Sequence, residues 1–367
     1  MEGNHFDVVV AGLGAMGSAT AAHLARRGKK VLGLERWLPG HQNASSHGDS
    51  RIIREMYFEH PMYVPLLQRA YELWAELGPV LNIYGGLMIG REDGMLVTGT
   101  LRSAKEHNLA HEILSAAEVR KRYPAFDLES DLIAVRDPRA GWLDPEQCNR
   151  EHLKVAAENG ADLHFEEPFE SWTATDNGVQ IKTSHATYSA DHLVLCVGAW
   201  TEGVPLEVER QSVFWFDVDG ESYGREQFPI WAFEYKAGHI TYGFPRLERG
   251  VKSSIMHSGE TVPNPDVVNR DVGDEEVEAL RKAIMPVLPQ LSKARVREKG
   301  TCLFTNTSDH DFVIDFHPAS SRVLISSACS GHGFKFASAI GEIQADLVTE
   351  GRSRFDLTPF SLSRFSQ

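Results

Sequence analysis

A glycine-rich turn between an apolar strand and a helix constrains the fold of this chain more than any other feature. Residues 7–11 read Asp-Val-Val-Val-Ala, and Gly12, Gly14 and Gly17 follow in the pattern Gly-x-Gly-x-x-Gly. The first glycine allows a tight turn, the second lets the backbone approach a pyrophosphate, and the third lets the helix lie close to the sheet. The helix N-terminus then offers unpaired N–H groups and a partial positive charge to phosphates. The sequence therefore predicts a Rossmann-like α/β unit that binds a dinucleotide.

An acidic residue ends the second predicted strand. Glu35 lies 18 positions after Gly17, where a carboxylate can accept hydrogen bonds from both ribose hydroxyls. The same charge would repel a 2′-phosphate, so it disfavours NADP. A glycine pattern alone is weak evidence, because it also fits a turn that binds nothing. A strand, a helix, a second strand and an acid in this order make the nucleotide interpretation strong.

The composition limits the number of domains, the partners and the compartment. A length of 367 residues suggests about two domains. The net charge of −14 disfavours nucleic acid and anionic membranes as partners, and the longest apolar stretches are strand-sized, too short to span a bilayer. The four cysteines lie far apart without Cys-x-x-Cys spacing, which disfavours a structural metal or a disulfide scaffold and favours a cytoplasmic location.

Hydrophobic periodicity along the rest of the chain predicts helices and strands in two groups. The apolar run 192–197 predicts a parallel strand that returns to the nucleotide sheet, and the aromatic-rich stretch 206–258 predicts an antiparallel sheet in a second domain. The expected helices are 62–77, 147–159, 274–287 and about 336–349, and the other expected strands are 161–166, 178–182, 311–316 and 322–327.

This order of elements predicts a discontinuous nucleotide domain with a sheet domain inserted between its pieces. An NAD dehydrogenase differs, because its two halves tend to follow one another in the sequence. The predicted nucleotide-binding domain comprises residues 1–83, 141–209 and 305–367, and the predicted substrate domain comprises residues 84–140 and 210–304.

Two segments carry cations whose role the residues alone leave open. Segment 45–54 ends in Arg51 and Arg54, which could bind a carboxylate or polarise a flavin, or could lie solvated at the surface. Segment 330–336 places Lys335 after two glycines at the start of the last helix. Glycines permit close backbone approach to a ligand, but a capped surface helix explains this segment equally well.

A third segment, 301–315, contains Cys302, and a lone cysteine is usually a small buried apolar residue. Taken together, the patterns closely resemble the monomeric sarcosine oxidase and N-methyl-L-tryptophan oxidase family of flavoenzymes, within the D-amino-acid oxidase superfamily, over nearly the whole length. The last residues resemble the N-methyltryptophan oxidase branch. The motifs that carry the resemblance are the Gly-x-Gly-x-x-Gly turn, 47–54, 242–245, 301–315, 330–336 and 355–365.

The resemblance implies a cofactor and a reaction. The cofactor is FAD, attached through a thioether to Cys302; Cys329 is the competing cysteine, but it is expected to lie in an apolar strand of the core. The reaction is oxidation of a secondary amine to an imine, which water hydrolyses to an amine and an aldehyde, while O₂ is reduced to H₂O₂. The implied partners are therefore a small amine and O₂, and the implied assembly is a monomer.

The resemblance also assigns residues to the reaction. Arg54 and Lys335 would bind a substrate carboxylate and orient the C–H bond toward the flavin. Lys252 would stabilise the anion that develops as O₂ is reduced, with Arg51 as a second cation near the ring, and His257 would contact the substrate. The implied FAD contacts are Gly12, Gly14, Gly17, Glu35, Arg36, Ser45, Ser46, His47, Arg51, Phe169, Gly198, Cys302, Gly331, Gly333, Phe334 and Lys335.

Two departures from the family pattern concern the substrate more than the reaction. Phe304 stands two positions after Cys302, where the family has tyrosine, and this makes the pocket more apolar and favours bulkier N-substituted substrates. Lys252 precedes His257 by five residues instead of four, which indicates a local bulge or a shifted correspondence.

Other functions fit parts of the same pattern. A fructosyl (Amadori) amino-acid oxidase shares the chemistry, and an FAD dehydrogenase would use an acceptor other than oxygen, although Lys252 argues against it. A nucleotide-binding regulatory module would leave Arg54, Lys335 and Cys302 without a role. The sequence does not determine the side chain or the N-substituent of the amine.

Overall fold

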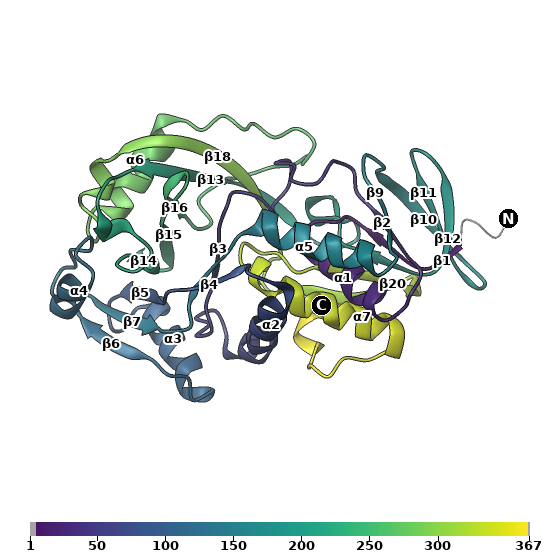
Figure 1. The fold of residues 1–367 in the computed structure, drawn as a ribbon, viewed down its shortest axis with the longest axis horizontal. Coiled ribbons are helices and arrows are strands. Elements are labelled where there is room, and N and C mark those ends of the chain that lie inside the picture. The colour runs from purple at the N-terminus through teal and green to yellow at the C-terminus, as the bar shows by residue number, and fades with distance from the viewer. Residues whose placement is uncertain (1–4, 366–367) are drawn as a thin grey trace.

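The computed structural model describes residues 5–365 as two large sheets with helices packed mainly on the first (Figure 1). Residues 1–4 and 366–367, which the predicted nucleotide-binding domain included, lie outside the described residues. The first sheet has the strand order β10-β11-β12-β1-β2-β9, with β20 beside β12 and β19 beside β20. Its strands are β1 (His5–Ala11), β2 (Val31–Leu34), β9 (Asp162–His164), β10 (Phe169–Thr175), β11 (Gly178–Thr183), β12 (Thr187–Leu195), β19 (Val313–His317) and β20 (Ser320–Ser327).

The centre of the first sheet is parallel and buried. β1 pairs in parallel with both β2 and β12, and Val9 lies opposite Leu32 on one side and Leu193 on the other. Strands buried on both faces are apolar throughout, which is why these runs were recognisable in the sequence. The prediction that 192–197 returns to the nucleotide sheet beside the glycine turn is confirmed.

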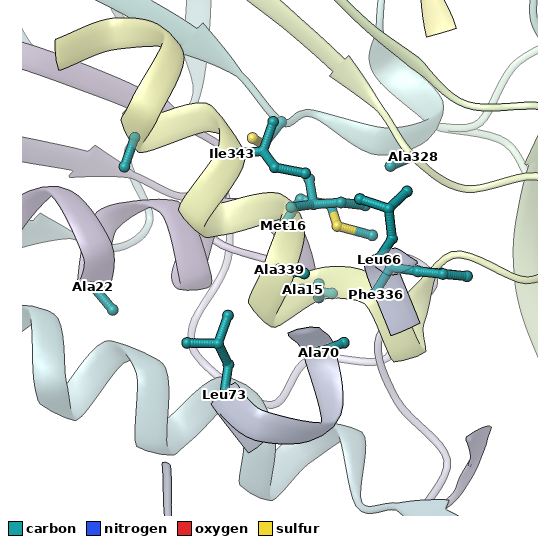
Figure 2. Close-up of a cluster of buried hydrophobic side chains, with 14 of the residues drawn as sticks. Ala15, Met16, Ala22, Leu66, Ala70, Leu73, Ala328, Phe336, Ala339 and Ile343 are labelled. Atoms are coloured by element: carbon teal, nitrogen blue, oxygen red, sulfur yellow. The ribbon is translucent and has the colours of Figure 1, made fainter. Parts of the chain in front are cut away.

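Helices cover this sheet. The four helices predicted from periodicity are present within three residues at either end, three of them on this sheet and the fourth, α6 (Asp274–Ile284), beside the second sheet. α1 packs against α5 and α7, and α2 packs on α7. A side chain at Gly341 of α7 would lie 2.6 Å from the backbone of Ala19 in α1, so the glycine permits this close packing. Figure 2 shows Met16, Leu66 and Ile343 from α1, α2 and α7 gathered in one apolar cluster. The helices are α1 (Ala15–Arg26), α2 (Val64–Leu77), α5 (Pro145–Glu158) and α7 (Ala337–Glu350).

The second sheet has the order β17-β13-β16-β15-β14-β5-β7-β6, and β18 pairs along β13. The predicted antiparallel arrangement holds except between β5 and β14, which pair in parallel because β5 enters from the separate 84–140 stretch. The strands are β5 (Gly86–Gly90), β6 (Glu112–Ser115), β7 (Ile133–Asp137), β13 (Glu207–Asp217), β14 (Ile230–Lys236), β15 (His239–Leu247), β16 (Gly250–Ile255), β17 (Glu260–Thr261) and β18 (Arg295–Asn306).

Smaller elements complete the fold. Three helices lie beside the second sheet, on the left of Figure 1: α3 (Met95–Glu106), α4 (Ala116–Arg122) and α6 (Asp274–Ile284). The short strands β3 (Arg51–Ile53), β4 (Leu81–Ile83) and β8 (Gly141–Leu143) form a third sheet. No helix within residues 5–365 is both long and apolar enough to cross a membrane.

Two features of the first sheet differ from the prediction. β10 was not predicted, because this edge strand is largely exposed and lacks a clear apolar alternation. Cys329 does not lie in a core strand. β20 ends at Ser327, and the chain turns into a segment with left-handed residues at Ser330 and Gly331. Cys329 is half-buried in this turn.

Candidate functional site

A single cavity of about 910 Å³ extends from the glycine turn of the first sheet to the face of the second sheet. Among the residues singled out in the sequence, only Gly17 and His257 do not line it. The residues that do are Gly12, Gly14, Glu35, Arg36, Ser45, Ser46, His47, Arg51, Arg54, Phe169, Gly198, Lys252, Cys302, Phe304, Cys329, Gly331, Gly333, Phe334 and Lys335. The fold thus brings together side chains from distant parts of the sequence.

The three glycines of the turn have different surroundings. Gly12 has a φ of +85°, and a side chain there would lie 2.5 Å from the carbonyl oxygen of Cys196. A side chain at Gly17 would lie 1.8 Å from the carbonyl oxygen of Gly12, so this glycine lets the helix start against the turn. A side chain at Gly14 would meet only Ser46 Oγ, at 3.5 Å, within the protein. The open face of Gly14 is therefore available to a ligand.

The acidic end of β2 is tied to the same turn. Glu35 accepts hydrogen bonds from the backbone N–H of Leu13 at 2.8 Å and of Trp37 at 3.2 Å. Nearby, Arg36 pairs with Asp266 at 2.6 Å. The carboxylate of Glu35 is held at the rim of the cavity by these bonds and keeps lone pairs for further donors.

The loop of residues 44–47 joins the glycine turn to the second sheet. Ser46 Oγ accepts a hydrogen bond from the N–H of Ala15 at 3.2 Å, and the Ser45 hydroxyl donates to the carbonyl of Leu303 at 2.6 Å. Burial lowers the pKa of His47 to about 3, and the nearby Arg51 adds to the shift. This imidazole is therefore neutral in the physiological range.

Lys252 is a buried cation in the cavity wall. Its ammonium donates to the backbone carbonyls of Gly48 at 2.5 Å and Ser50 at 2.9 Å. Burial lowers its pKa to about 7, and Arg51 contributes in the same direction, whereas Asp49 opposes the shift. The charge on Lys252 is therefore sensitive to small changes in its surroundings.

A second cationic region lies near the start of α7. Arg54 pairs with Glu59 at 2.6 Å. Burial alone would raise the pKa of Glu59, but Arg54, His332 and Lys335 together hold that pKa below its usual range. Lys335 donates to the carbonyl of His332 at 2.7 Å, and burial lowers its pKa to about 7. The Arg54 guanidinium lies 4.3 Å, and the Lys335 ammonium 5.3 Å, from the centre of the Tyr57 ring. Both cations therefore lie against one tyrosine ring.

An apolar wall forms part of the cavity lining. Six lining residues belong to one hydrophobic cluster: Ile52, Phe58, Ala232, Ile240, Phe244 and Met256. Phe304 also lines the cavity, in a separate cluster with Val213, Trp215 and Cys302.

The five-residue spacing after Lys252 has a structural explanation. Met256, four positions on, lines the cavity, whereas His257 adopts a left-handed conformation with a φ of +51°. This turns the imidazole to Glu209, with Nδ1 3.1 Å from the carboxylate, and its ring packs on Phe304. Met256, and not His257, thus lines the cavity, and the contact of His257 with the substrate stays a prediction. Sequence reasoning missed Met256, although the expected spacing of four would have found it.

Sequence reasoning also missed Glu59. It follows Arg54 by five residues, outside the motif that drew attention to the arginine. Only a search for a counter-charge to the buried guanidinium would have found it.

Comparison with known proteins identifies the family of this chain. The family described as DAO, FAD dependent oxidoreductase, matches residues 7–347. The chain belongs to this family of FAD-dependent oxidoreductases.

Individual relatives extend the comparison to the whole chain. The monomeric sarcosine oxidase of Streptomyces avermitilis is 41% identical, over 98% of each chain. The N-methyl-L-tryptophan oxidase of Escherichia coli is 33% identical, over 98% of this chain and 99% of the relative. The solved structure of L-proline dehydrogenase from P. horikoshii has a TM-score of 0.86 over 99% of this chain and 98% of that chain, at 20% identity, and so shares the fold.

The cavity of this FAD-dependent oxidoreductase fits its cofactor. The open face of Gly14 suits a pyrophosphate, and Ser50 Oγ is a buried hydroxyl without a partner among the described residues that lines the cavity. A bound polar ring would supply the missing hydrogen bond. Residues 5–365 hold no cluster of metal-ligating side chains.

Both Cys302 and Cys329 line the cavity of this family member. Cys302 is buried on β18, where burial raises the pKa of its thiol, although Arg51 and Lys252 oppose the shift. Cys329 is half-buried, and burial raises the pKa of its thiol to about 11. Arg51 and Lys252 thus act on the thiol of Cys302, although burial outweighs them and its pKa stays raised.

Proposed function

We propose that this protein is an oxidase of secondary amines, acting on N-methyl or other N-alkyl amino acids. The observation that carries the proposal is that Arg54, Lys335 and an apolar wall line the same cavity as the glycine turn. Two cations suit a carboxylate, and the apolar wall suits the N-alkyl group and the side chain. The names of the sarcosine and N-methyltryptophan oxidases among the relatives support the same substrate class.

The cations would also set the protonation state of the amine. Bound FAD supplies an acceptor for the two electrons of the C–H bond, and an amine can release them only as the free base. Lys335, and Arg54 to the extent that Glu59 does not neutralise it, disfavour a further positive charge in the buried pocket, so they favour the neutral amine. By holding the carboxylate, they also fix the orientation of the C–H bond, and such positioning lowers the barrier to reaction.

The overall reaction balances in three steps. The secondary amine loses two electrons and two protons to become an imine, and water then splits the imine into an amine and an aldehyde. O₂ takes up the two electrons and two protons to become H₂O₂. We propose that the ammonium of Lys252 stabilises the negative charge that develops on oxygen, with Arg51 as a second cation, because a preorganised charge in a dry site lowers such a barrier.

The remaining parts of the proposal concern attachment and assembly. We propose that Cys302 carries the FAD through a thioether, supported by the position of this thiol in the cavity wall. We also propose that the protein acts as a monomer in the cytoplasm, without nucleic acid or membrane partners. The word monomeric in the names of several relatives and the net charge of −14 support this part.

An absorption spectrum of the purified protein tests the proposal. Anaerobic addition of an N-methyl amino acid should bleach the flavin, and admission of air should restore the colour and release one H₂O₂ per amine. The panel is sarcosine, N-methyltryptophan and a fructosyl amino acid. Bleaching by the fructosyl compound alone would favour an Amadori oxidase, and flavin that stays reduced in air would indicate a dehydrogenase. No bleaching by any of the three would overturn the proposal.

A further inference from the structure

The ammonium of Lys252 is held by the two backbone carbonyls that flank Asp49. The carbonyls of Gly48 and Ser50 accept two of its three N–H groups, which leaves one N–H for a ligand in the cavity. Asp49 Oδ1 lies 3.9 Å from the same nitrogen. The segment from Gly48 to Ser50 thus surrounds the ammonium with two carbonyl dipoles and one carboxylate.

This arrangement requires two consecutive residues with positive φ angles, and hydrogen bonds from a neighbouring helix stabilise them. Gly48 and Asp49 have φ values of +95° and +57°, a conformation that is uncommon for residues other than glycine. Glu146, in the first turn of α5, accepts hydrogen bonds from the N–H groups of both, at 2.6 and 3.2 Å. These bonds direct the two N–H groups to α5, while the carbonyls of Gly48 and Ser50 face Lys252.

The side chain of Asp49 is held from the other side by β13. The indole N–H of Trp215 lies 3.2 Å and 3.3 Å from the two carboxylate oxygens. Arg249 stacks 3.7 Å from the centre of the same indole and pairs with Glu298. The carboxylate is therefore fixed between a buried lysine and an aromatic donor.

We propose that Asp49 is a positioning residue, which with Glu146 keeps the Lys252 ammonium charged and aimed into the cavity at neutral pH. It acts through Lys252 and does not line the cavity itself. The consequence for oxygen reduction rests on the function proposed above, but the effect on the charge of Lys252 does not.

The charges around Lys252 show why Asp49 has this effect. Burial and Arg51 lower the pKa of Lys252 to about 7, whereas Asp49, Cys302 and Glu146 raise it. At 3.9 Å Asp49 is the one carboxylate within ion-pair distance of the ammonium among the described residues. Two other titratable or charged groups of the same region are His47 and Arg249; the pKa of His47 is lowered to about 3, and Arg249 is paired with Glu298.

The variant Asp49→Asn tests the charge alone, because an amide oxygen can still accept from the Trp215 indole. The holoprotein is labelled with ¹³C-lysine, and the Lys252 signal, assigned by its loss in Lys252→Met, is followed against pH. We expect the midpoint near pH 7 in the wild type to fall by about one pH unit or more. Glu146→Gln should move the midpoint in the same direction by less, and Asp49→Glu should largely restore it.

Oxygen reactivity provides a second measurement. The flavin is reduced by light without any amine, so the result does not depend on the substrate. The rate of reoxidation in Asp49→Asn should match that of the wild type at a pH below both midpoints and should fall increasingly behind it toward pH 8.

Midpoints of the Lys252 titration that are unchanged in both Asp49→Asn and Glu146→Gln would overturn the proposal. Slower reoxidation by the same factor at every pH would indicate a merely structural role and would also overturn it. Bleaching by none of the amines, with the shifted midpoint intact, would count against the proposed function alone.

Discussion

The guanidinium of Arg54 lies 2.7 Å and 2.6 Å from the two carboxylate oxygens of Glu59 in the wall of the cavity. The residue expected to bind a substrate carboxylate therefore already has an internal one. A substrate must share Arg54 with Glu59 or displace it, while Lys335 donates only to a backbone carbonyl among the described residues. The free positive charge of this region thus resides mainly on Lys335.

Replacing either cation should weaken the binding of amino-acid substrates. A charge-assisted hydrogen bond contributes about 1.5–3 kcal/mol, so Arg54→Ala and Lys335→Ala should each raise KM by about tenfold to a hundredfold. Steady-state kinetics with N-methyltryptophan and its decarboxylated counterpart N-methyltryptamine would measure this. The amine without a carboxylate should be almost unaffected, and equal losses for both compounds would show that these residues hold the fold or the flavin instead.

Because Phe304 adds an apolar side chain to the cavity wall, N-methyltryptophan should be preferred to sarcosine.

Attachment of the flavin can be tested on the two cysteines of the cavity. Cys302→Ser should release the flavin on acid precipitation, because a hydroxyl does not form the thioether, and the pellet should lose its yellow colour. Cys329→Ser is the matched control and should remain yellow. Loss of colour in the control alone would reassign the attachment to Cys329.

Lys252→Met should slow reoxidation of the reduced flavin more than its reduction by the amine. Loss of one preorganised charge in a buried site should cost roughly 10²–10³-fold in rate. Stopped-flow measurement of the two half-reactions separates these effects. Lys252→Arg, which keeps the charge, should recover part of the rate, and an equal slowing of both half-reactions would contradict the role in oxygen reduction.

Two glycines of the turn should respond differently to the same substitution. Gly14→Ala has room within the protein, so folding should be unchanged while flavin incorporation falls, because the methyl group occupies the face left to the pyrophosphate. Gly17→Ala would place its methyl group 1.8 Å from the carbonyl oxygen of Gly12 and should destabilise the protein by about 1–3 kcal/mol or more. Thermal unfolding and the ratio of flavin to protein would distinguish them. Normal flavin content in Gly14→Ala would argue against the close approach.

The buried lysines should make stability depend on pH in a defined direction. Lys252 and Lys335 have pKa values near 7 in the folded protein, lowered from 10.5 chiefly by burial. Between these values the unfolded chain binds more protons, so the free energy of unfolding should rise with pH from about 7 to 10.5, by about 1.4 kcal/mol per pH unit for each lysine. Below pH 7 both lysines are charged in the folded as well as in the unfolded protein, so the burial of each charge lowers the free energy of unfolding by its full amount.

Denaturant unfolding of Lys335→Met measures this effect. The stability of the variant relative to the wild type should be highest at pH 6 and should decline steadily toward pH 10. Lys154→Met, at an exposed position of α5, is the control and should show no such trend. A constant difference between Lys335→Met and the wild type across this range would show that Lys335 is not desolvated as the structure indicates.

The sequence by itself determined the nucleotide-binding unit. Gly12, Gly14 and Gly17 act through local backbone geometry, and the buried parallel strands are apolar on both faces, so both are visible in a short window. The positions of the four helices followed from periodicity for the same reason. The motifs also predicted which residues would meet in the site. In the structure, Arg54, Lys335 and most of the other candidates line one cavity.

Only the tertiary structure decided how these residues act on one another. Glu59 beside Arg54 and Asp49 beside Lys252 depend on how separate segments pack, and so do the lowered pKa values of the two lysines, since desolvation is a property of the whole surrounding shell. The choice of Met256 over His257 as a lining residue depends on one left-handed turn at the end of β16. His257 lies beyond the end of β16 and contacts Glu209 of β13, and a contact between separate segments is not visible in a short window of the sequence.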